Sequence, residues 1–257
     1  MFQKNHFLTL LFRITLLVFL FISCSSKNKN YISIATAANM QFAMKELSEN
    51  FTQKTGINCE IMVSSSGKLT AQIKEGAPYD IFVSADMKYP NNLYNAGFTK
   101  TKPVIYGYGK LVLWTLFDSI KPSFKILQNK NIKHIAVANP KTAPYGKATY
   151  QLLQKKTILS LLEPKFVFGE SIAQTNQFIT TKSAEIGFTA KSVVVAPQTK
   201  GKGNWIEVNE EFYTPISQGI VLLKNGTGNK NHTQQFYNFI LSDEGKNILS
   251  KFGYSTN

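Results

Sequence analysis

The chain has 257 residues, 43% of them hydrophobic, which is enough for one large domain or two lobes with cores of their own. Its formal net charge is +14, and lysine carries nearly all of its positive charge because Arg13 is the only arginine. Arginine is the usual clamp for carboxylates and phosphates. Its absence after residue 13 argues against an amino-acid receptor, a nucleotide site built on arginine and direct reading of DNA bases. The lysines are scattered, which indicates a solvated surface and no nucleic-acid partner.

The N-terminus has the pattern of a secretory signal. Lys4 and Arg13 flank an apolar run that stops at a serine and Cys24, and this arrangement is typical of such signals. The letters FISC, which end at Cys24, resemble a bacterial lipobox, whose cysteine becomes the lipidated first residue. We therefore expect a lipoprotein signal peptide over 1–23 and a polar tether over 24–30, with a plain signal peptide or a membrane anchor as the alternative. The protein would then lie outside the cytoplasm, anchored to a membrane through Cys24.

The sequence pattern after the tether predicts a β-α-β-α-β unit. Three short apolar runs indicate strands, and the segments between them carry apolar residues at helical spacing. Because the connections are short, the strands should form a parallel sheet with helices on its faces. The expected strands are 31–35, 57–63 and 79–84, and the expected helices are 40–55 and 69–75.

A second α/β unit follows residue 105. We expect a two-lobed α/β fold in which each lobe is a mainly parallel sheet flanked by helices. The first lobe would hold 31–109 and 216–257, and the second lobe would hold 110–215. The expected strands here are 110–114, 135–138, 166–168, 186–190 and 216–223, and the expected helices include 152–153 and span 172–181 and 236–252.

The stretch VSSSGKLT, at 63–70, admits three chemistries. A phosphate loop requires G-x-x-x-x-G-K-[ST], but Leu69 follows the lysine and Met62 stands at the upstream glycine position. A serine acyl-enzyme would use Ser65 with Lys68, which satisfy S-x-x-K. The accompanying K-T-G triplet lies upstream of the serine, however, at the end of an expected helix where Gly56 is most simply a C-cap.

The third chemistry is an uncharged socket for an anion. Here a strand ends, small polar residues form a turn and a helix begins; we call such a strand-to-helix turn a corner. Free backbone N–H groups point outward from it at the positive end of the helix. Corners of this kind lie together at the carboxyl ends of parallel strands, where ligands bind. The sequence has four of them, two in each unit: 37–39, 64–66, 144–146 and 170–172.

With these corners, the sequence resembles the molybdate-binding proteins that supply ABC transporters and have the type II periplasmic-binding-protein fold. The resemblance covers residues 31–257. It rests on the order and spacing of five motifs: ATAANM at 35–40, SSSGKLTAQI at 64–73, GAPYDIFVSAD at 76–86, NPKTAPYG at 139–146 and GESIAQT at 169–175.

The resemblance also implies the residues that hold the oxyanion. Some family members have a ligand tyrosine where this chain has Ala190 and an alanine where it has Tyr145, so the hydroxyl is expected from a different loop. Asn39 likewise replaces a common serine. The implied binding residues are Ala38, Asn39, Ser65, Ser66, Tyr145 and Ile172.

The chemistry of the ligand agrees with such a socket. Molybdate and tungstate are dianions near neutral pH, so their oxygens only accept hydrogen bonds. Monoprotonated phosphate would favour a carboxylate acceptor, and the corners offer only Glu170, whose simpler role is that of a first-turn helix acid. Sulfate differs from molybdate mainly in size, so a sulfate or phosphate receptor remains an alternative. We expect a monomeric binding protein without enzymatic activity, cofactor or bound metal cation, whose partner is an ABC permease.

Overall fold

The computed structural model describes residues 30–256. The expected signal peptide, the lipidation site Cys24 and all but the last residue of the expected tether lie outside the described residues. Between residues 30 and 256, no helix is long and apolar enough to cross a membrane.

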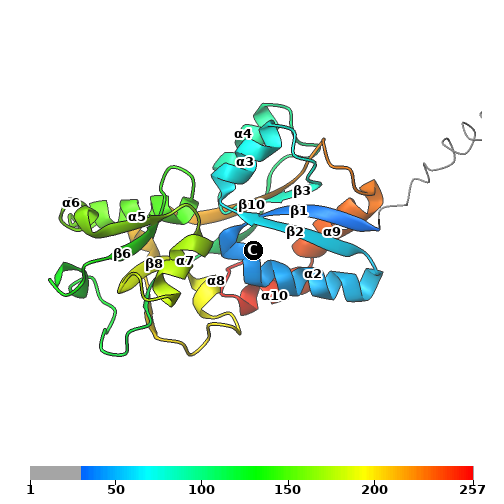
Figure 1. Cartoon of the computed structure of the whole chain (residues 1–257). Coiled ribbons are helices and arrows are strands. Elements are labelled where there is room, and N and C mark those ends of the chain that lie inside the picture. Colours follow the sequence, from blue (N-terminus) through cyan, green and yellow to red (C-terminus); the bar gives the residue numbers. More distant parts are fainter. Residues whose placement is uncertain (1–29, 257) are drawn as a thin grey trace, which may run out of the picture.

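Two five-stranded sheets lie side by side, each flanked by helices (Figure 1). In each sheet one strand runs against the other four, β10 in the first and β5 in the second. This confirms the expected two-lobed α/β fold with mainly parallel sheets. The first sheet has the order β2 (Asn58–Ser64), β1 (Tyr31–Ala37), β3 (Ile81–Val83), β10 (Ile216–Leu222) and β4 (Val104–Gly109). The second has the order β7 (Phe166–Gly169), β6 (Ile135–Ala138), β8 (Ile186–Ala190), β5 (Leu111–Thr115) and β9 (Asn204–Glu207).

The first long helix, α2 (Gln41–Thr55), buries the apolar face that its sequence pattern predicts. Met44, Leu47 and Phe51 recur at helical spacing and are buried in the core of the first lobe, where apolar burial stabilises the fold. Gly56 ends the helix at a φ of 70°, a left-handed conformation that glycine adopts without strain. The K-T-G triplet is therefore a helix end, as expected.

Most of the remaining helices follow a strand, whereas α6, η3 and α10 follow another helix. Several begin close to the boundary between the two lobes, which is where the candidate site lies. They are η1 (Ala38–Met40), α3 (Ser66–Lys74), α4 (Lys88–Asn95), η2 (Ile126–Gln128), α5 (Pro144–Lys155), α6 (Leu159–Leu162), η3 (Glu163–Lys165), α7 (Ile172–Thr180), α8 (Lys191–Val194), η4 (Glu210–Phe212), α9 (Lys230–Leu241) and α10 (Asp243–Lys251).

The observed elements differ from the expected ones in what was missed and in one boundary. The sequence pattern missed the strands β4 and β9 and the helices α4, α6 and α8. α4 carries Pro90 in its first turn, a position that tolerates proline. The expected helix over 236–252 is two helices. Ser242 separates them, since it leaves the helical conformation and its hydroxyl accepts the N–H of Gly245 at 3.3 Å to cap α10.

Candidate functional site

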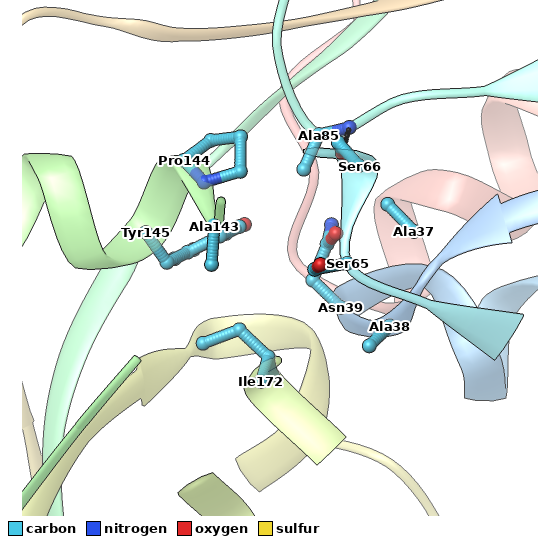
Figure 2. Close-up of a pocket in the computed structure, with 10 residues that line it drawn as sticks. All are labelled: Ala37, Ala38, Asn39, Ser65, Ser66, Ala85, Ala143, Pro144, Tyr145 and Ile172. Atoms are coloured by element: carbon cyan, nitrogen blue, oxygen red, sulfur yellow. Dashed lines mark hydrogen bonds between the residues drawn. The ribbon is translucent and has the colours of Figure 1, made fainter. Parts of the chain in front are cut away.

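A small pocket lies where the two lobes meet (Figure 2). The pocket is small, about 10 Å³, so with the lobes in this arrangement it has no room for a sugar or an amino acid. Its ten lining residues carry no formal charge near neutral pH: Ala37, Ala38, Asn39, Ser65, Ser66, Ala85, Ala143, Pro144, Tyr145 and Ile172.

The pocket contains all six residues that the sequence predicted for ligand binding. Figure 2 shows Tyr145 reaching from one lobe toward Asn39 and Ser65 of the other, with Ile172 below them. Four additional residues line the pocket. Ala37 and Pro144 belong to the corners that the sequence indicated but were not among the expected binding residues, and Ala85 and Ala143 lie outside those corners. Their side chains carry no polar signal, so nothing in residue type distinguished them. The ligand contacts themselves stay a prediction.

Four helix N-termini border the pocket. η1 begins at Ala38 and continues directly into α2, α3 begins at Ser66, α5 begins at Pro144 and α7 begins at Ile172. The first N–H groups of a helix have no partner within it, and they lie at the positive end of the helix dipole. The pocket therefore offers hydrogen-bond donors and a favourable potential for an anion without any cationic side chain.

The two serines of the second corner have their oxygens already engaged as acceptors. Ser65 Oγ accepts the N–H of Lys68 at 3.3 Å and so caps α3. Ser66 Oγ accepts the N–H of Ala85 at 2.9 Å, and its side chain is fully buried. Because each oxygen receives a hydrogen bond from the backbone, each hydroxyl retains its own hydrogen for a ligand in the pocket.

Asn39 is held by a buried network. Its amide Nδ2 donates to Gln218 Oε1 at 2.9 Å and to the hydroxyl of Tyr254 at 3.0 Å. The Tyr254 hydroxyl and the Ser192 hydroxyl both donate to the carbonyl oxygen of Asn39, at 3.0 Å and 2.7 Å. Both amide hydrogens of Asn39 are therefore engaged inside the protein, which leaves its backbone N–H as the donor that it can offer to the pocket.

Tyr145 remains a neutral phenol in this setting. Burial raises its pKa well above the ordinary value, and the neighbouring Tyr254 raises it further, although hydrogen bonds with Gln218 and Asn39 act in the opposite direction. Its side chain is 1% exposed, and its hydroxyl accepts a hydrogen bond from Gln218 Nε2 at 3.2 Å. The hydroxyl group can therefore serve as a donor at any pH near neutrality.

Other contacts join the lobes at the rim of the pocket. The N–H of Gly67 donates to the carbonyl oxygen of Thr142 at 3.0 Å, and the Tyr89 hydroxyl donates to the carbonyl oxygen of Lys141 at 3.1 Å. A Cβ added at Gly67 would lie 3.0 Å from the backbone of Thr142. The glycine of VSSSGKLT therefore permits close approach of the two lobes.

Lys68 and Glu170 form an ion pair between the lobes, with Nζ and Oε2 3.3 Å apart. The Asn139 side chain and Lys68 together lower the pKa of Glu170, so its carboxylate is ionised. Glu170 is not among the residues that line the pocket. The Nζ atom of Lys68 is thus paired with a carboxylate of the other lobe. Between residues 30 and 256 there is also no group of three or more histidine, cysteine, aspartate or glutamate side chains that could hold a metal ion.

A family model described as "Bacterial extracellular solute-binding protein" matches residues 32–255. The chain belongs to this solute-binding family. It is 35% identical over 223 residues to the molybdate-binding protein ModA of Rhodobacter capsulatus, a match that covers 86% of this chain and 87% of the relative. It is 34% identical over 229 residues to ModA of Azotobacter vinelandii, with 87% and 89% covered.

A solved structure supports the same relationship. The periplasmic molybdate-binding protein of Azotobacter vinelandii superimposes with a TM-score of 0.83 at 31% identity, over 88% of this chain and 99% of that protein. The resemblance to molybdate-binding proteins that the sequence motifs indicated is thus confirmed. The two-lobed arrangement of the sheets is thus shared with a solved molybdate-binding protein.

Proposed function

We propose that the protein is an extracytoplasmic solute-binding lipoprotein that captures molybdate or tungstate between its lobes and delivers it to an ABC permease. The observation that carries this proposal is the pocket itself, whose lining residues supply helix N-termini and hydroxyl groups but no carboxylate and no ammonium group. The names of the relatives support molybdate as the ligand.

The proposed ligand contacts come from both lobes. The first lobe would contribute the N–H groups of Ala38 and Asn39 and the hydroxyls of Ser65 and Ser66. The second lobe would contribute the Tyr145 hydroxyl and, as a sixth donor, the N–H of Ile172, and all six residues line the pocket. A dianion strengthens each such hydrogen bond, because charge-assisted bonds are about twice as strong as neutral ones.

Closure around the ligand would be a population shift. An anion that touches donors of both lobes stabilises the closed state more than the open one. The chain passes between the sheets after β4 and again before β10, so we place the hinge near 107–112 and 213–218. The lobes would then comprise 31–109 with 216–257, and 110–215.

A lipid on Cys24 would keep the monomeric receptor at the outer face of the membrane, close to the permease that it supplies. Cleavage before Cys24 and lipidation can be tested by the mass of the mature N-terminal peptide and by incorporation of labelled palmitate. A Cys24→Ala variant that still incorporates palmitate would contradict this part.

Calorimetry on the protein without residues 1–24 tests the ligand. We expect molybdate and tungstate to bind at least about 100-fold more tightly than sulfate, a difference of about 2.7 kcal/mol, and phosphate to bind weakest. Sulfate that binds as tightly as molybdate would replace the proposed ligand. The same titration with phosphate tests the phosphate-receptor alternative.

A further inference from the structure

Gln218 is a fully buried polar residue in an otherwise mostly apolar strand. It lies on β10, where the pairing with β4 shifts register between Gln218 and Gly219. Such an irregularity re-aims a side chain relative to a regular strand. The side chain of Gln218 does not line the pocket, but it contacts two residues that do, Asn39 and Tyr145.

The hydrogen bonds around Gln218 fix the orientation of its amide. The Tyr254 hydroxyl donates to the carbonyl oxygen of Asn39, so it must accept from Asn39 Nδ2, and this contact places the Asn39 amide nitrogen. The same nitrogen donates to Gln218 Oε1 at 2.9 Å. The Tyr106 hydroxyl lies 2.5 Å from that oxygen and 3.1 Å from the carbonyl oxygen of Ser84, and its one hydrogen is shared between these two acceptors. Because Oε1 accepts from Asn39, the nitrogen Nε2 faces Tyr145.

This orientation of the Gln218 amide fixes the direction of the hydroxyl hydrogen of Tyr145. Gln218 Nε2 donates to the Tyr145 oxygen at 3.2 Å, so the hydroxyl hydrogen has to point away from Gln218. An oxyanion accepts hydrogen bonds only, so a tyrosine that presented a lone pair to it would repel it. We propose that Gln218 is a positioning residue that keeps the Tyr145 hydroxyl as a hydrogen-bond donor toward the bound oxyanion. This inference rests on the proposed function.

The lack of a side chain at Gly109 leaves room for the contact between Tyr145 and Gln218. A Cβ at Gly109 would collide with both the Tyr145 hydroxyl oxygen and Gln218 Nε2. Gly109 ends β4, immediately before the chain crosses into the second lobe. The contact between Tyr145 of the second lobe and Gln218 of the first therefore occupies a space that only glycine provides at this crossing.

A double-mutant cycle tests the inference with molybdate as the titrant. Gln218→Met keeps the approximate size of the side chain but removes both the donor to Tyr145 and the oxygen that accepts from Asn39, and we expect affinity to fall about 10-fold or more. Gln218→Glu, which keeps that oxygen, separates the two losses. Tyr145→Phe should weaken binding by a similar factor. In the Tyr145→Phe background, Gln218→Met should cause less than about a 3-fold further loss, because the hydroxyl through which it acts is absent. Gln234→Met, on the exposed face of α9, is the matched control and should bind like the wild type.

A pH profile provides a readout that a purely structural role would not change. Gln218→Glu retains an oxygen for Asn39 and Tyr106, but when ionised it draws the Tyr145 hydrogen to itself. A buried carboxyl group titrates well above its usual pKa of about 4.3, up to about 8–9. The affinity of this variant should therefore rise as pH falls from about 8.5 to 6, while that of the wild type stays constant.

The groups that face position 218 do not titrate in this range. They are Tyr106 from β4, Tyr145 from α5 and, across Asn39, Tyr254 near the C-terminus, and burial raises the pKa of each of them. Repulsion between the bound anion and an ionised carboxylate introduced at position 218 would also depend on pH. The Gln218→Glu, Tyr145→Phe double variant measures that repulsion alone, so its dependence on pH should be weaker.

The outcomes separate this inference from the proposed function. Independent, multiplicative effects of Gln218→Met and Tyr145→Phe would overturn the positioning role, as would wild-type affinity in a Gln218→Met protein whose unfolding temperature is unchanged. If the wild type prefers sulfate or phosphate, the ligand assignment fails, and the same cycle with the preferred anion still decides the role of Gln218. A wild type that binds none of the four anions would overturn both.

Discussion

The backbone N–H of Gly67 in the first lobe donates to the carbonyl oxygen of Thr142 in the second lobe at 3.0 Å. This bond lies beside the pocket, since the neighbouring Ser66 and Ala143 both line it. The lobes therefore touch through their main chains at the rim, and any side chain at position 67 would have to enter that contact. The closed arrangement depends on this glycine.

We expect Gly67→Ala to weaken molybdate binding about 10-fold or more, a loss of about 1.4 kcal/mol. The new Cβ would lie 3.0 Å from Thr142 and 2.9 Å from the Tyr89 hydroxyl, so it would disfavour the closed state. Titration calorimetry measures the affinity, and small-angle scattering with saturating molybdate measures closure. Ser64→Ala, in the same turn but outside the pocket, should bind normally. Unchanged affinity in Gly67→Ala would contradict the role of this contact.

Ser66→Ala should weaken molybdate binding about 10- to 100-fold, because it removes a hydrogen-bond donor to a charged ligand. It should also lower the free energy of unfolding by about 1–3 kcal/mol, since the buried N–H of Ala85 loses its acceptor. Calorimetry and chemical denaturation measure the two effects on one preparation. A protein that loses stability but keeps its affinity would show that Ser66 serves the fold alone.

Glu207 should make stability depend on pH. It lies between Lys191, at 2.5 Å, and Lys110, at 3.2 Å. Although partial burial by itself raises its pKa, the hydrogen bonds with both lysines outweigh this effect and hold the pKa below the usual value. A lowered folded pKa means that the stabilisation is complete above the unfolded pKa of about 4.3 and is lost as pH falls through the folded pKa.

Glu207→Gln should therefore lower the unfolding temperature at neutral pH, and the difference from the wild type should vanish toward about pH 3. Thermal unfolding followed by circular dichroism across the pH range measures it. Glu60→Gln, on the exposed side of β2, provides the control and should show little difference at any pH. A constant difference between Glu207→Gln and the wild type would argue against the ionised interaction.

The thiol of Cys59 should react slowly. Burial raises its pKa to about 12, with a hydrogen bond from Thr52 opposing this shift. At pH 8 the folded protein should hold roughly 1,000-fold less thiolate than an ordinary cysteine would. Reaction with a disulfide reagent, with and without guanidinium chloride, measures the ratio on protein that lacks Cys24. Equal rates in the two conditions would contradict the prediction.

The sequence was sufficient to predict the fold class and to bring six residues to one pocket. Strand-to-helix corners are local patterns, and parallel strands place such corners at the same edge of a sheet. This topological rule groups the corners within each lobe. The resemblance to molybdate-binding proteins then implied that residues of both lobes, such as Ser65 and Ile172, line one pocket.

The network behind the pocket could not be predicted in the same way. Tyr106, Gln218 and Tyr254 come from three segments of the first lobe that lie far apart in the chain, and they are linked only through the folded lobe, Tyr106 directly to Gln218 and Tyr254 through Asn39. One signal was available, because Gln218 interrupts an apolar strand, and a buried amide requires partners. The partners themselves depend on the shifted register of β10, which no local pattern indicates. For the same reason, the sequence did not reveal that both amide hydrogens of Asn39 are engaged internally.

The absence of formal charge on the ten lining residues has one further consequence. Tyr145 is the single member of that set with an ionisable side chain, and burial keeps it protonated. A dianion that enters the pocket therefore exchanges no hydrogen ions with the surrounding buffer. Uptake should release the same heat in buffers of different ionisation enthalpy, and the receptor should load equally well in mildly acidic and mildly alkaline surroundings.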